Sequence, residues 1–305
     1  MPKAVYFLML PNVLLLDVSG PAEVLRLAGQ FQQHYVSPVP QVTCSIGMTI
    51  GQLAPLPQRW NEGDILVIPG VADSSHYFAT EEAALARNWL RALRPALAQR
   101  QIDLVCVCSG ALLAAQAGLL DGYHCTTHHA VIERLRQQAP AALVKENRIF
   151  VEDRGVFTSA GITAGIDLAL HLVNQYCGAD RALEIAREMV VYFRRSGDDP
   201  QLSPWLRYRN HLHPAVHRAQ DVMAAEPEAE WSVPQVAEKA HVSSRHLARL
   251  FRLHIGLSVR EYHEQLRLAV AQQRLQQGYG LEKAALTAGF SSGRQLRRAQ
   301  QRWQA

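Results

Sequence analysis

Short apolar runs alternate with helical patterns through the first part of this chain. The runs predicted to be strands are Ala4–Leu10, Val42–Ile46, Ile65–Ile68 and Ile102–Cys108. Helical patterns such as Gly20–Ala28 and Glu81–Arg100 lie between them. Each run is mostly apolar and bounded by turn residues, which is typical of a strand buried on both faces. The alternation therefore predicts an α/β fold, with a mostly parallel sheet covered by helices on both sides.

A change in composition then divides the chain into two parts. A hairpin is expected over Arg148–Thr158, followed by helices at about Ala164–Tyr176 and Ala179–Val191. The stretch Arg194–Pro204 (RRSGDDPQLSP) is the clearest break, and only helical patterns follow it. We therefore expect a first domain at residues 1–193, a linker at 194–212 and an all-helical domain at 213–305.

Length and composition agree with two ordinary globular domains. The chain has 305 residues, of which 48% are hydrophobic and 19% charged, and this excludes wholesale disorder. No apolar run reaches the roughly 18 residues that a membrane span needs, so no membrane partner is expected. The five cysteines lack C-x-x-C spacing, which predicts reduced thiols, a cytoplasmic location, and neither a metal nor a cofactor.

The positive charge is concentrated at the end of the chain. From Trp231 to Ala305 there are 12 basic and 4 acidic residues, a net charge of +8, so the remainder carries −4. A basic appendage on an acidic body is typical of a nucleic-acid-binding domain. A solvated helical face is the alternative interpretation of the charge alone.

The basic region contains an internal repeat that fits two helix-turn-helix units. Its matching residues are Ala237, His241, Val242, Leu247 and Arg249 in the first copy, and Ala285, Gly289, Phe290, Leu296 and Arg298 in the second. Ser243 and Ser291 stand where an N-cap for the second helix of each unit is needed. The amphipathic stretch Val259–Gln277 predicts a connecting helix of roughly 27 Å, near the ~34 Å between successive major-groove faces.

Residues Pro214–Trp303 resemble the AraC-family DNA-binding domain. The resemblance rests on SSRHLARLFRLHIGLSVREY, RLAVAQQRL and AGFSSGRQLRRA. It implies double-stranded promoter DNA as the partner, with one recognition helix of each unit in the major groove. The DNA-binding residues that it implies are Ser244, Arg245, Ala248 and Arg249 in the first unit and Arg294, Gln295 and Arg298 in the second. Arg252, Arg297 and Arg302 are expected to contact phosphates or solvent.

Three positions depart from the AraC pattern. His241 replaces the turn glycine that is common in the first unit, and Gln300 stands where the family often has Phe. The sequence stops at Ala305, before the usual Gly-x-x-Pro. We therefore expect the second unit to be less well packed and to contribute less affinity.

A cysteine lies at a predicted strand-to-helix turn in the first domain. Cys108, Ser109 and Gly110 join the strand Ile102–Cys108 to a helix at Ala111–Ala117. A helix N-terminus favours a thiolate, and its N–H groups can hold a carboxylate or an oxyanion. The alternative is a small buried residue at a tight turn, which we favour for Cys106 but not for Cys108.

Further residues are expected to converge on Cys108, because ligands bind at the carboxyl ends of strands in open α/β sheets. They are Asp17 in LDVSGPAEV, Gly70 after DILVIP, and Thr127 and His128 in CTTHH. His129 is expected to be structural or on the surface.

This region, about residues 3–190, resembles the ThiJ/PfpI, class I glutamine-amidotransferase-like superfamily. The resemblance rests on LDVSGPAEV, VCSGALLAAQAGLLDG, TTHH and TSAGITAGIDLALHL. It implies a flavodoxin-like sheet, and it is strongest to the first domain of AraC-type regulators, which are similar to isocyanide hydratases. In such hydratases the matching residues form the catalytic pair, which would make Cys108 the nucleophile and Asp17 its acid/base partner. Ser109 stands where the peptidase branch has His, so proteolysis is disfavoured.

Two hypotheses follow from the two resemblances. In the first, the protein is a transcription regulator that is not an enzyme, and its first domain senses a small-molecule effector. The ligand-binding residues would be Asp17, Gly70, Cys108, Ser109, Gly110, Thr127 and His128. The relatives suggest a small nitrogen-containing metabolite, and a homodimer through the first domain is expected, with the helices at Ala164–Val191 as the candidate face. The alternative is an isocyanide-hydratase-like enzyme using Cys108 and Asp17, or a redox sensor using Cys108.

Overall fold

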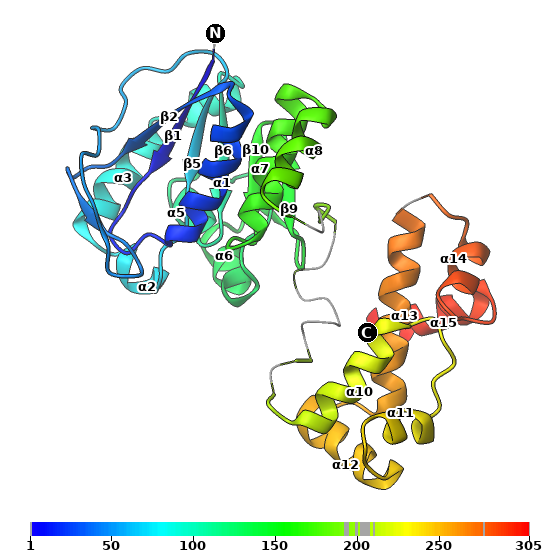
Figure 1. The fold of residues 1–305 in the computed structure, drawn as a ribbon. Helices are drawn as coiled ribbons and strands as arrows, with labels where there is room; N and C mark the ends of the chain where they lie inside the picture. The colour runs from blue at the N-terminus through cyan, green and yellow to red at the C-terminus, as the bar shows by residue number, and fades with distance from the viewer. Residues whose placement is uncertain are drawn as a thin grey trace. The chain divides into compact units, whose positions relative to one another are not determined.

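The computed structural model describes residues 2–191, 195–198, 201, 208–209, 211–276 and 278–304 (Figure 1). The chain divides into two compact units, at residues 1–201 and 202–305. Much of the linker expected at 194–212 lies outside the described residues, so its bounds stay a prediction. Within the described ranges, we find no helix with the length and apolar character to cross a membrane.

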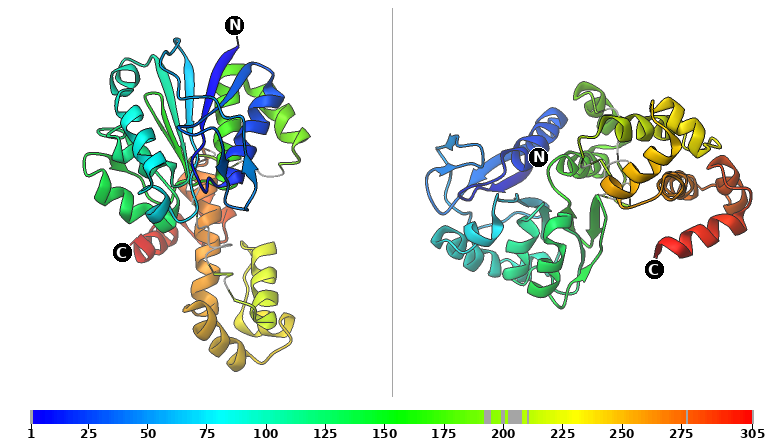
Figure 2. Two further views of the ribbon diagram at one scale, coloured as in Figure 1. Left: turned by 90° about the vertical axis from the view of Figure 1, so that its left-hand side faces the viewer. Right: turned by 90° about the horizontal axis from the view of Figure 1, so that it is seen from below.

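A six-stranded sheet forms the centre of the first unit. Its order is β2 (Phe31–Val36), β1 (Lys3–Leu8), β5 (Asp64–Ile68), β6 (Ile102–Val107), β10 (Val156–Ser159) and β9 (Phe150–Asp153). All neighbours are parallel except β10 and β9, which form the expected hairpin. The mostly parallel α/β sheet predicted from the alternation is therefore confirmed, with helices on both faces (Figures 1 and 2).

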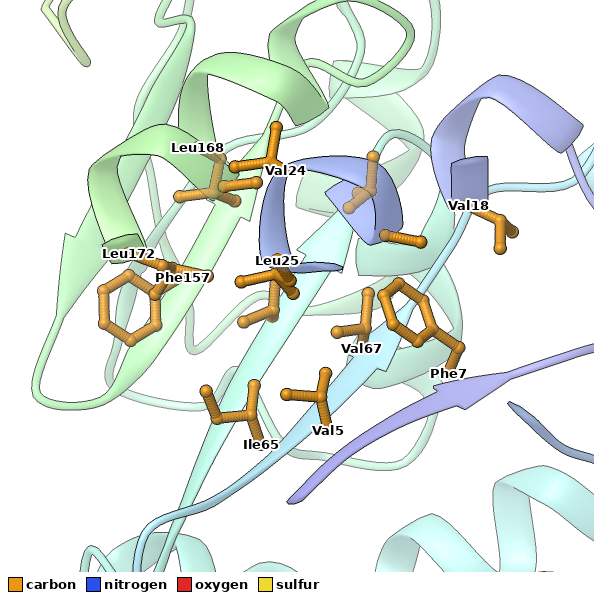
Figure 3. Close-up of a cluster of buried hydrophobic side chains, with 14 of the residues drawn as sticks. Val5, Phe7, Val18, Val24, Leu25, Ile65, Val67, Phe157, Leu168 and Leu172 are labelled. Carbon is orange, nitrogen blue, oxygen red and sulfur yellow. The ribbon is translucent and has the colours of Figure 1, made fainter. Parts of the chain in front are cut away.

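Alternate residues of the strands pack against helices on opposite faces. On one face, strand residues such as Val5, Ile65 and Val67 contact α1 (Leu15–Ala28) and α7 (Ala164–Cys177), as Figure 3 shows. The helix α8 (Ala179–Glu188) contributes to the same cluster. The expected helices at 164–176 and 179–191 are therefore present, the second ending earlier than predicted.

The opposite face of the sheet carries a second apolar cluster. Leu66, Ile68 and Leu104 lie on it with residues of several short helices. These helices are α3 (Glu81–Arg91), α4 (Arg94–Ala98), α5 (Gly110–Gln116) and α6 (Ile132–Gln138). Smaller elements connect them: β3 (Val42–Thr43), β4 (Thr49–Ile50), α2 (Ser74–Tyr77), β7 (His124–Cys125), η1 (His129–Val131) and β8 (Leu143–Val144).

Three boundary predictions were wrong. The strand expected at Val42–Ile46 is only β3, which pairs with β4 outside the main sheet, whereas β2 occupies the sheet edge. The β2 sequence FQQHYV is polar because an edge strand is partly exposed, so it lacked the apolar signal. The helix expected at Gly20 begins at Leu15, and the one expected over Glu81–Arg100 breaks into α3 and α4.

In the part of the second unit that the structure describes, all regular elements are helices, as predicted. The helix α10 (Pro214–Ala225) precedes a first pair, α11 (Val233–Lys239) and α12 (Ser244–Ile255), and a second pair, α14 (Leu281–Thr287) and α15 (Gly293–Gln304). The 18-residue helix α13 (Val259–Gln276) connects the pairs, close to the predicted bounds. Each pair has its own apolar cluster, the second containing Phe290, Leu296 and Ala299.

Candidate functional sites

Cys108 lies at a strained turn between β6 and α5. Its φ is +55°, a left-handed backbone conformation that residues other than Gly rarely adopt. Its N–H donates to the carbonyl of Ser159 on β10 at 3.0 Å. Two glycines permit the turn: a Cβ at Gly110 would lie 2.0 Å from the Ile68 carbonyl oxygen, and one at Gly161 would lie 2.0 Å from the Cys108 Cβ. Close packing therefore fixes the thiol at the carboxyl edge of the sheet.

Asp17, from the first turn of α1, is completely buried beside this thiol. Its carboxylate accepts hydrogen bonds from the backbone nitrogens of Gly70 at 3.1 Å and Ile162 at 2.6 Å, and it also bonds to the Cys108 side chain. Burial raises the pKa of Asp17 to about 6, although these three hydrogen bonds lower it. The predicted pairing of Asp17 with Cys108 is thus present in the structure.

The expectation that the helix N-terminus favours a thiolate at Cys108 was wrong. Burial and the neighbouring Asp17 carboxylate together raise the pKa of the thiol to about 12. A hydrogen bond from the Ser109 backbone acts in the opposite direction but is outweighed. At neutral pH the side chain is therefore a thiol, and the adjacent carboxyl carries the charge.

A cavity of about 400 Å³ opens above this turn. Of the predicted ligand-binding residues, Cys108, Ser109 and His128 line it. The other predicted ligand-binding residues, Asp17, Gly70, Gly110 and Thr127, are buried and are not among its lining residues. They position the wall instead: for example, the Thr127 hydroxyl donates to the Cys108 carbonyl oxygen at 2.7 Å.

Two charged residues of this cavity were not predicted from the sequence. Arg134 on α6 lines it and donates to the Ser74 hydroxyl at 3.2 Å, and Asp73 lines it just before α2. Neither lies in a strand-end motif, so no local signal in the sequence points to them. The cavity thus presents one cation and one anion, beside the His128 imidazole, whose pKa is lowered by burial and by His129.

A larger hollow of about 800 Å³ lies elsewhere on the first unit. Its lining charges are largely paired with one another, since Arg195 contacts Asp167 at 2.6 Å and His171 contacts Glu152 at 2.7 Å. Because these charges already neutralise one another, the Cys108 cavity is the better candidate for the binding of a small ligand.

In the second unit, α12 exposes most of the predicted DNA-binding residues of its pair. Arg245, Ala248 and Arg249 are exposed, and Ser244 is half-buried at the first position of the helix. Ser243 caps the helix as predicted, because its hydroxyl accepts from the His246 backbone at 3.3 Å.

The cap of α15 is Ser292, so the prediction of Ser291 was wrong. The Gln295 backbone nitrogen donates to the Ser292 hydroxyl at 3.3 Å, as His246 does to Ser243. The extra turn residue of the second copy precedes the cap, which shifts the serine by one. Aligned on their caps, α15 places Arg294, Arg297 and Arg298 where α12 places Arg245, Ala248 and Arg249.

Gln295 bonds to the turn before α15 through its side chain. Its side-chain oxygen accepts from the Ser291 backbone nitrogen at 2.6 Å and from the Ser291 hydroxyl at 2.9 Å. The side chain is exposed, but these bonds hold it against the turn that begins the helix.

Two arginines expected to contact phosphates or solvent are largely exposed and also form ion pairs with α13. Arg252 contacts Glu261 at 3.0 Å. Arg302 contacts Glu264 at 3.0 Å, and the Trp303 indole donates to the same carboxylate at 2.9 Å. His241, at the departure from the turn glycine, adopts a φ of +57°. The helix pair therefore keeps the glycine-type turn with a residue that tolerates it less well.

Comparison with known proteins accounts for both units. The model of the DJ-1/PfpI family matches residues 3–175, and that of a helix-turn-helix domain matches residues 236–304. The chain is 30% identical over 300 residues to the HTH-type transcriptional regulator GbdR of Pseudomonas aeruginosa, covering 95% of this chain and 79% of that protein. The chain belongs to the DJ-1/PfpI family and is an AraC-type transcriptional regulator.

Two further similarities concern mainly the first unit of the regulator. It is 35% identical over 179 residues to the isonitrile hydratase of Pseudomonas putida, covering 58% of this chain and 73% of the enzyme. The crystal structure of an AraC family transcriptional regulator from Pseudomonas putida superimposes with a TM-score of 0.53 at 21% identity, covering 62% of this chain and all of that one. The latter similarity shows the fold.

Proposed function

We propose that this regulator senses a small molecule in the Cys108 cavity and binds promoter DNA through α12 and α15. The observation that carries the proposal is the repeated geometry of the second unit. Two capped helices with exposed arginines belong to two helix pairs, and an 18-residue helix connects the pairs. A length of about 27 Å for that helix is near the ~34 Å between successive major-groove faces.

The proposed contacts differ slightly between the two recognition helices. On α12 they are Ser244, Arg245, Ala248 and Arg249, and on α15 Arg294, Arg297 and Arg298. Arg forms bidentate hydrogen bonds with guanine, so these side chains supply direct recognition of bases. Gln295 was predicted to belong to this set, but its hydrogen bonds to Ser291 favour a role in fixing the turn.

We propose a small zwitterionic or nitrogen-containing acid as the effector. A cavity of about 400 Å³ has room only for a small molecule. The Arg134 guanidinium would bind a carboxylate group of the effector. Asp73, which lines the same cavity, would bind its positively charged nitrogen. The thiol of Cys108 and the imidazole of His128 complete the polar lining.

Hydratase-like catalysis is the second candidate function, favoured by the Cys108–Asp17 pair and by the partial match to isonitrile hydratase. Catalysis would require Asp17 to take the thiol proton so that the thiolate attacks an electrophilic carbon. With the pKa of Cys108 near 12 and that of Asp17 near 6, the proton stays on sulfur. We propose the sensing role first because the relatives that match both units are transcriptional regulators, whereas the hydratase matches only part of the chain.

The proposed assembly is a homodimer formed through the first domain, acting in the cytoplasm. The helix α8 and the residues after it carry exposed apolar side chains, Leu183 at 41% and Val190 at 84% exposure, which fit an interface. Sedimentation equilibrium of the full chain, compared with Leu183→Glu, tests this assembly.

Fluorescence anisotropy on DNA from upstream of the protein's own and neighbouring genes tests the main proposal. We expect affinity at least about 10³-fold higher than for scrambled DNA, with a steep dependence on salt. Arg249→Ala should weaken binding, whereas Arg91→Ala, a control on the first unit, should not. Sequence-indifferent binding by the wild-type protein would contradict the proposal, and turnover of isonitriles that is lost in Cys108→Ser would support the second candidate.

A further inference from the structure

Gln201, in the predicted linker, is hydrogen-bonded through its side chain to loops of the first unit. Gln201 comes after α8 in the chain and is only 9% exposed. Its side-chain amide donates to the carbonyl oxygens of Thr127 at 2.8 Å and Arg148 at 2.9 Å, while its oxygen accepts from the His129 backbone at 2.9 Å. Both amide hydrogens and the oxygen therefore have backbone partners, an arrangement that no other side chain of this length satisfies.

The loop that Gln201 holds is also a wall of the Cys108 cavity. Thr127 and His129, two of its partners, flank His128, which lines the cavity. The His128 and His129 rings lie 4.2 Å apart between centroids, so the two side chains pack together. The Thr127 hydroxyl donates to the Cys108 carbonyl oxygen from the other side. A displacement of the His128 backbone therefore moves two neighbouring partners of Gln201, the Thr127 carbonyl and the His129 N–H.

A second linker residue is fastened next to the other wall. The Arg195 backbone nitrogen and guanidinium both bond to the Asp167 carboxylate, at 3.0 Å and 2.6 Å, and the guanidinium also bonds to Thr163 at 2.9 Å. Thr163 directly follows Ile162, which lines the cavity and donates its N–H to Asp17. We call Arg195 and Gln201 together the linker anchor.

We propose that the linker anchor couples occupancy of the Cys108 cavity to the freedom of the linker that leads to the DNA-binding unit. The coupling rests on the proposed function, since it makes the cavity a regulatory site. Hydrogen bonds weaken steeply with distance and angle, so a small shift of the 127–129 loop suffices to release Gln201. A ligand that binds the anchored and released states unequally then shifts the balance between them, and release alters ligand affinity by the same factor.

Limited digestion of the full-length protein by trypsin tests the anchor without any ligand. Cleavage after Arg195, identified by mass spectrometry, reports release because Arg195 is held in the anchored state. We expect Gln201→Ala to be cleaved there about tenfold faster than wild type, as the loss of several neutral hydrogen bonds implies. Gln99→Ala, at an exposed glutamine after α4, is the matched control. Equal rates for Gln201→Ala and wild type would overturn the proposal.

The coupling to the cavity is tested by Thr127→Val. This variant removes the hydroxyl bond to Cys108 but leaves the Thr127 carbonyl that Gln201 uses. We expect cleavage after Arg195 to be about threefold faster, on the scale of one lost hydrogen bond. His128→Ala provides the same test should the valine variant fail to fold. Unchanged cleavage in a folded cavity variant would show an anchor that does not respond to the cavity, and would overturn the proposal.

DNA affinity then separates this proposal from the proposed function. In a double-mutant cycle on promoter DNA, the effect of His128→Ala on affinity should shrink at least about threefold in the Gln201→Ala background. Additive effects would overturn the role of the anchor in regulation. A wild-type protein that binds no DNA specifically would instead overturn the proposed function, while the digestion result would still decide whether the cavity and linker are coupled.

Discussion

The carboxylate of Asp17 lies 2.6 Å from the backbone nitrogen of Ile162, a residue 145 positions later in the chain. The same carboxylate accepts from Gly70, so one buried side chain joins α1 to two loops at the carboxyl edge of the sheet. The bond to Ile162 also fixes the segment that carries Gly161, against which the Cys108 side chain packs. The Cys108 cavity therefore depends on an acidic group that is not among its lining residues.

Replacement of Asp17 by Asn is expected to destabilise the first unit. The amide of Asn offers one acceptor oxygen, so one of the two buried N–H groups loses its partner. The expected cost is about 1–3 kcal/mol at pH 7, where Asp17 is ionised, seen as a lower Tm of the first unit in differential scanning calorimetry. Asp121→Asn, at an exposed position that follows the buried Leu120, is the control and should leave Tm unchanged. Equal stability of Asp17→Asn and wild type would contradict this account of the carboxylate.

Because the pKa of Asp17 is raised, the difference in stability between wild type and Asp17→Asn should depend on pH. In the folded protein Asp17 binds its proton with a pKa of about 6, against 3.8 in the unfolded chain. Between these values the folded state holds more protons, so its stability falls as pH rises from about 4 to 6. The advantage of wild type over Asp17→Asn should therefore shrink by about 3 kcal/mol over this window and then stay level. Urea unfolding at pH 4, 5, 6 and 7 measures it, and a constant difference would refute the prediction.

The lowered pKa of His263 predicts that the stability of the second unit depends on pH in the opposite direction. It lies on α13 with its Nε2 bonded to the Pro227 carbonyl, and burial, with Arg267 nearby, lowers its pKa to about 4. The unfolded chain gains a proton near pH 6.5, before the folded state does, so stability falls as pH drops from 6.5 to 4. The loss is at most about 3 kcal/mol. His263→Gln keeps a donor for Pro227 and should reduce this loss, as urea unfolding of the full chain would show. A loss of equal size in both proteins would exclude His263 as its source.

What the sequence predicted well is what depends on local patterns. The interior strands are apolar on both faces, so their apolar runs and the turn residues at their ends locate them in the sequence. Cys108 and Asp17 follow such strands, so the same turn residues point to them. The edge strand Phe31–Val36 is polar because one side of it is exposed, and no period distinguishes it from a loop. Arg134 and Gln201 take part in the sensing unit only through contacts between distant segments, which a single sequence does not display.

A one-residue shift between the two copies of the repeat makes the cap of the second copy ambiguous from the sequence alone. The offset between copies is 48 residues up to Phe290 and 49 from the cap onward, so Ser291 and Ser292 are both plausible in the sequence. The hydrogen bond from Gln295 to Ser292 decides between them. The same shift exchanges Gln295 for Arg297 in the proposed set of DNA-contacting residues.

Ser292→Ala is accordingly expected to destabilise α15 by about 1 kcal/mol, because the helix loses its cap. Ser291→Ala should cost less, since the Ser291 backbone N–H still bonds to Gln295 in that variant. Hydrogen exchange over residues 293–299 in the two variants measures the difference. Greater loss of protection in Ser291→Ala would place the cap one residue earlier than the structure does.

Two arginines of α15 are expected to have different roles, one in DNA contact and the other in an ion pair within the second unit. Arg298 is exposed on the helix, whereas Arg302 is bonded to Glu264 on α13. Arg298→Ala should weaken specific DNA binding by about 1–3 kcal/mol and relax the preference at one base pair. Arg302→Ala should change DNA affinity less, and Glu264→Gln should resemble it, because both break the same ion pair. Anisotropy titrations at several salt concentrations distinguish the cases: a lower salt slope for Arg302→Ala, but not for Glu264→Gln, would show that Arg302 leaves Glu264 to contact a phosphate.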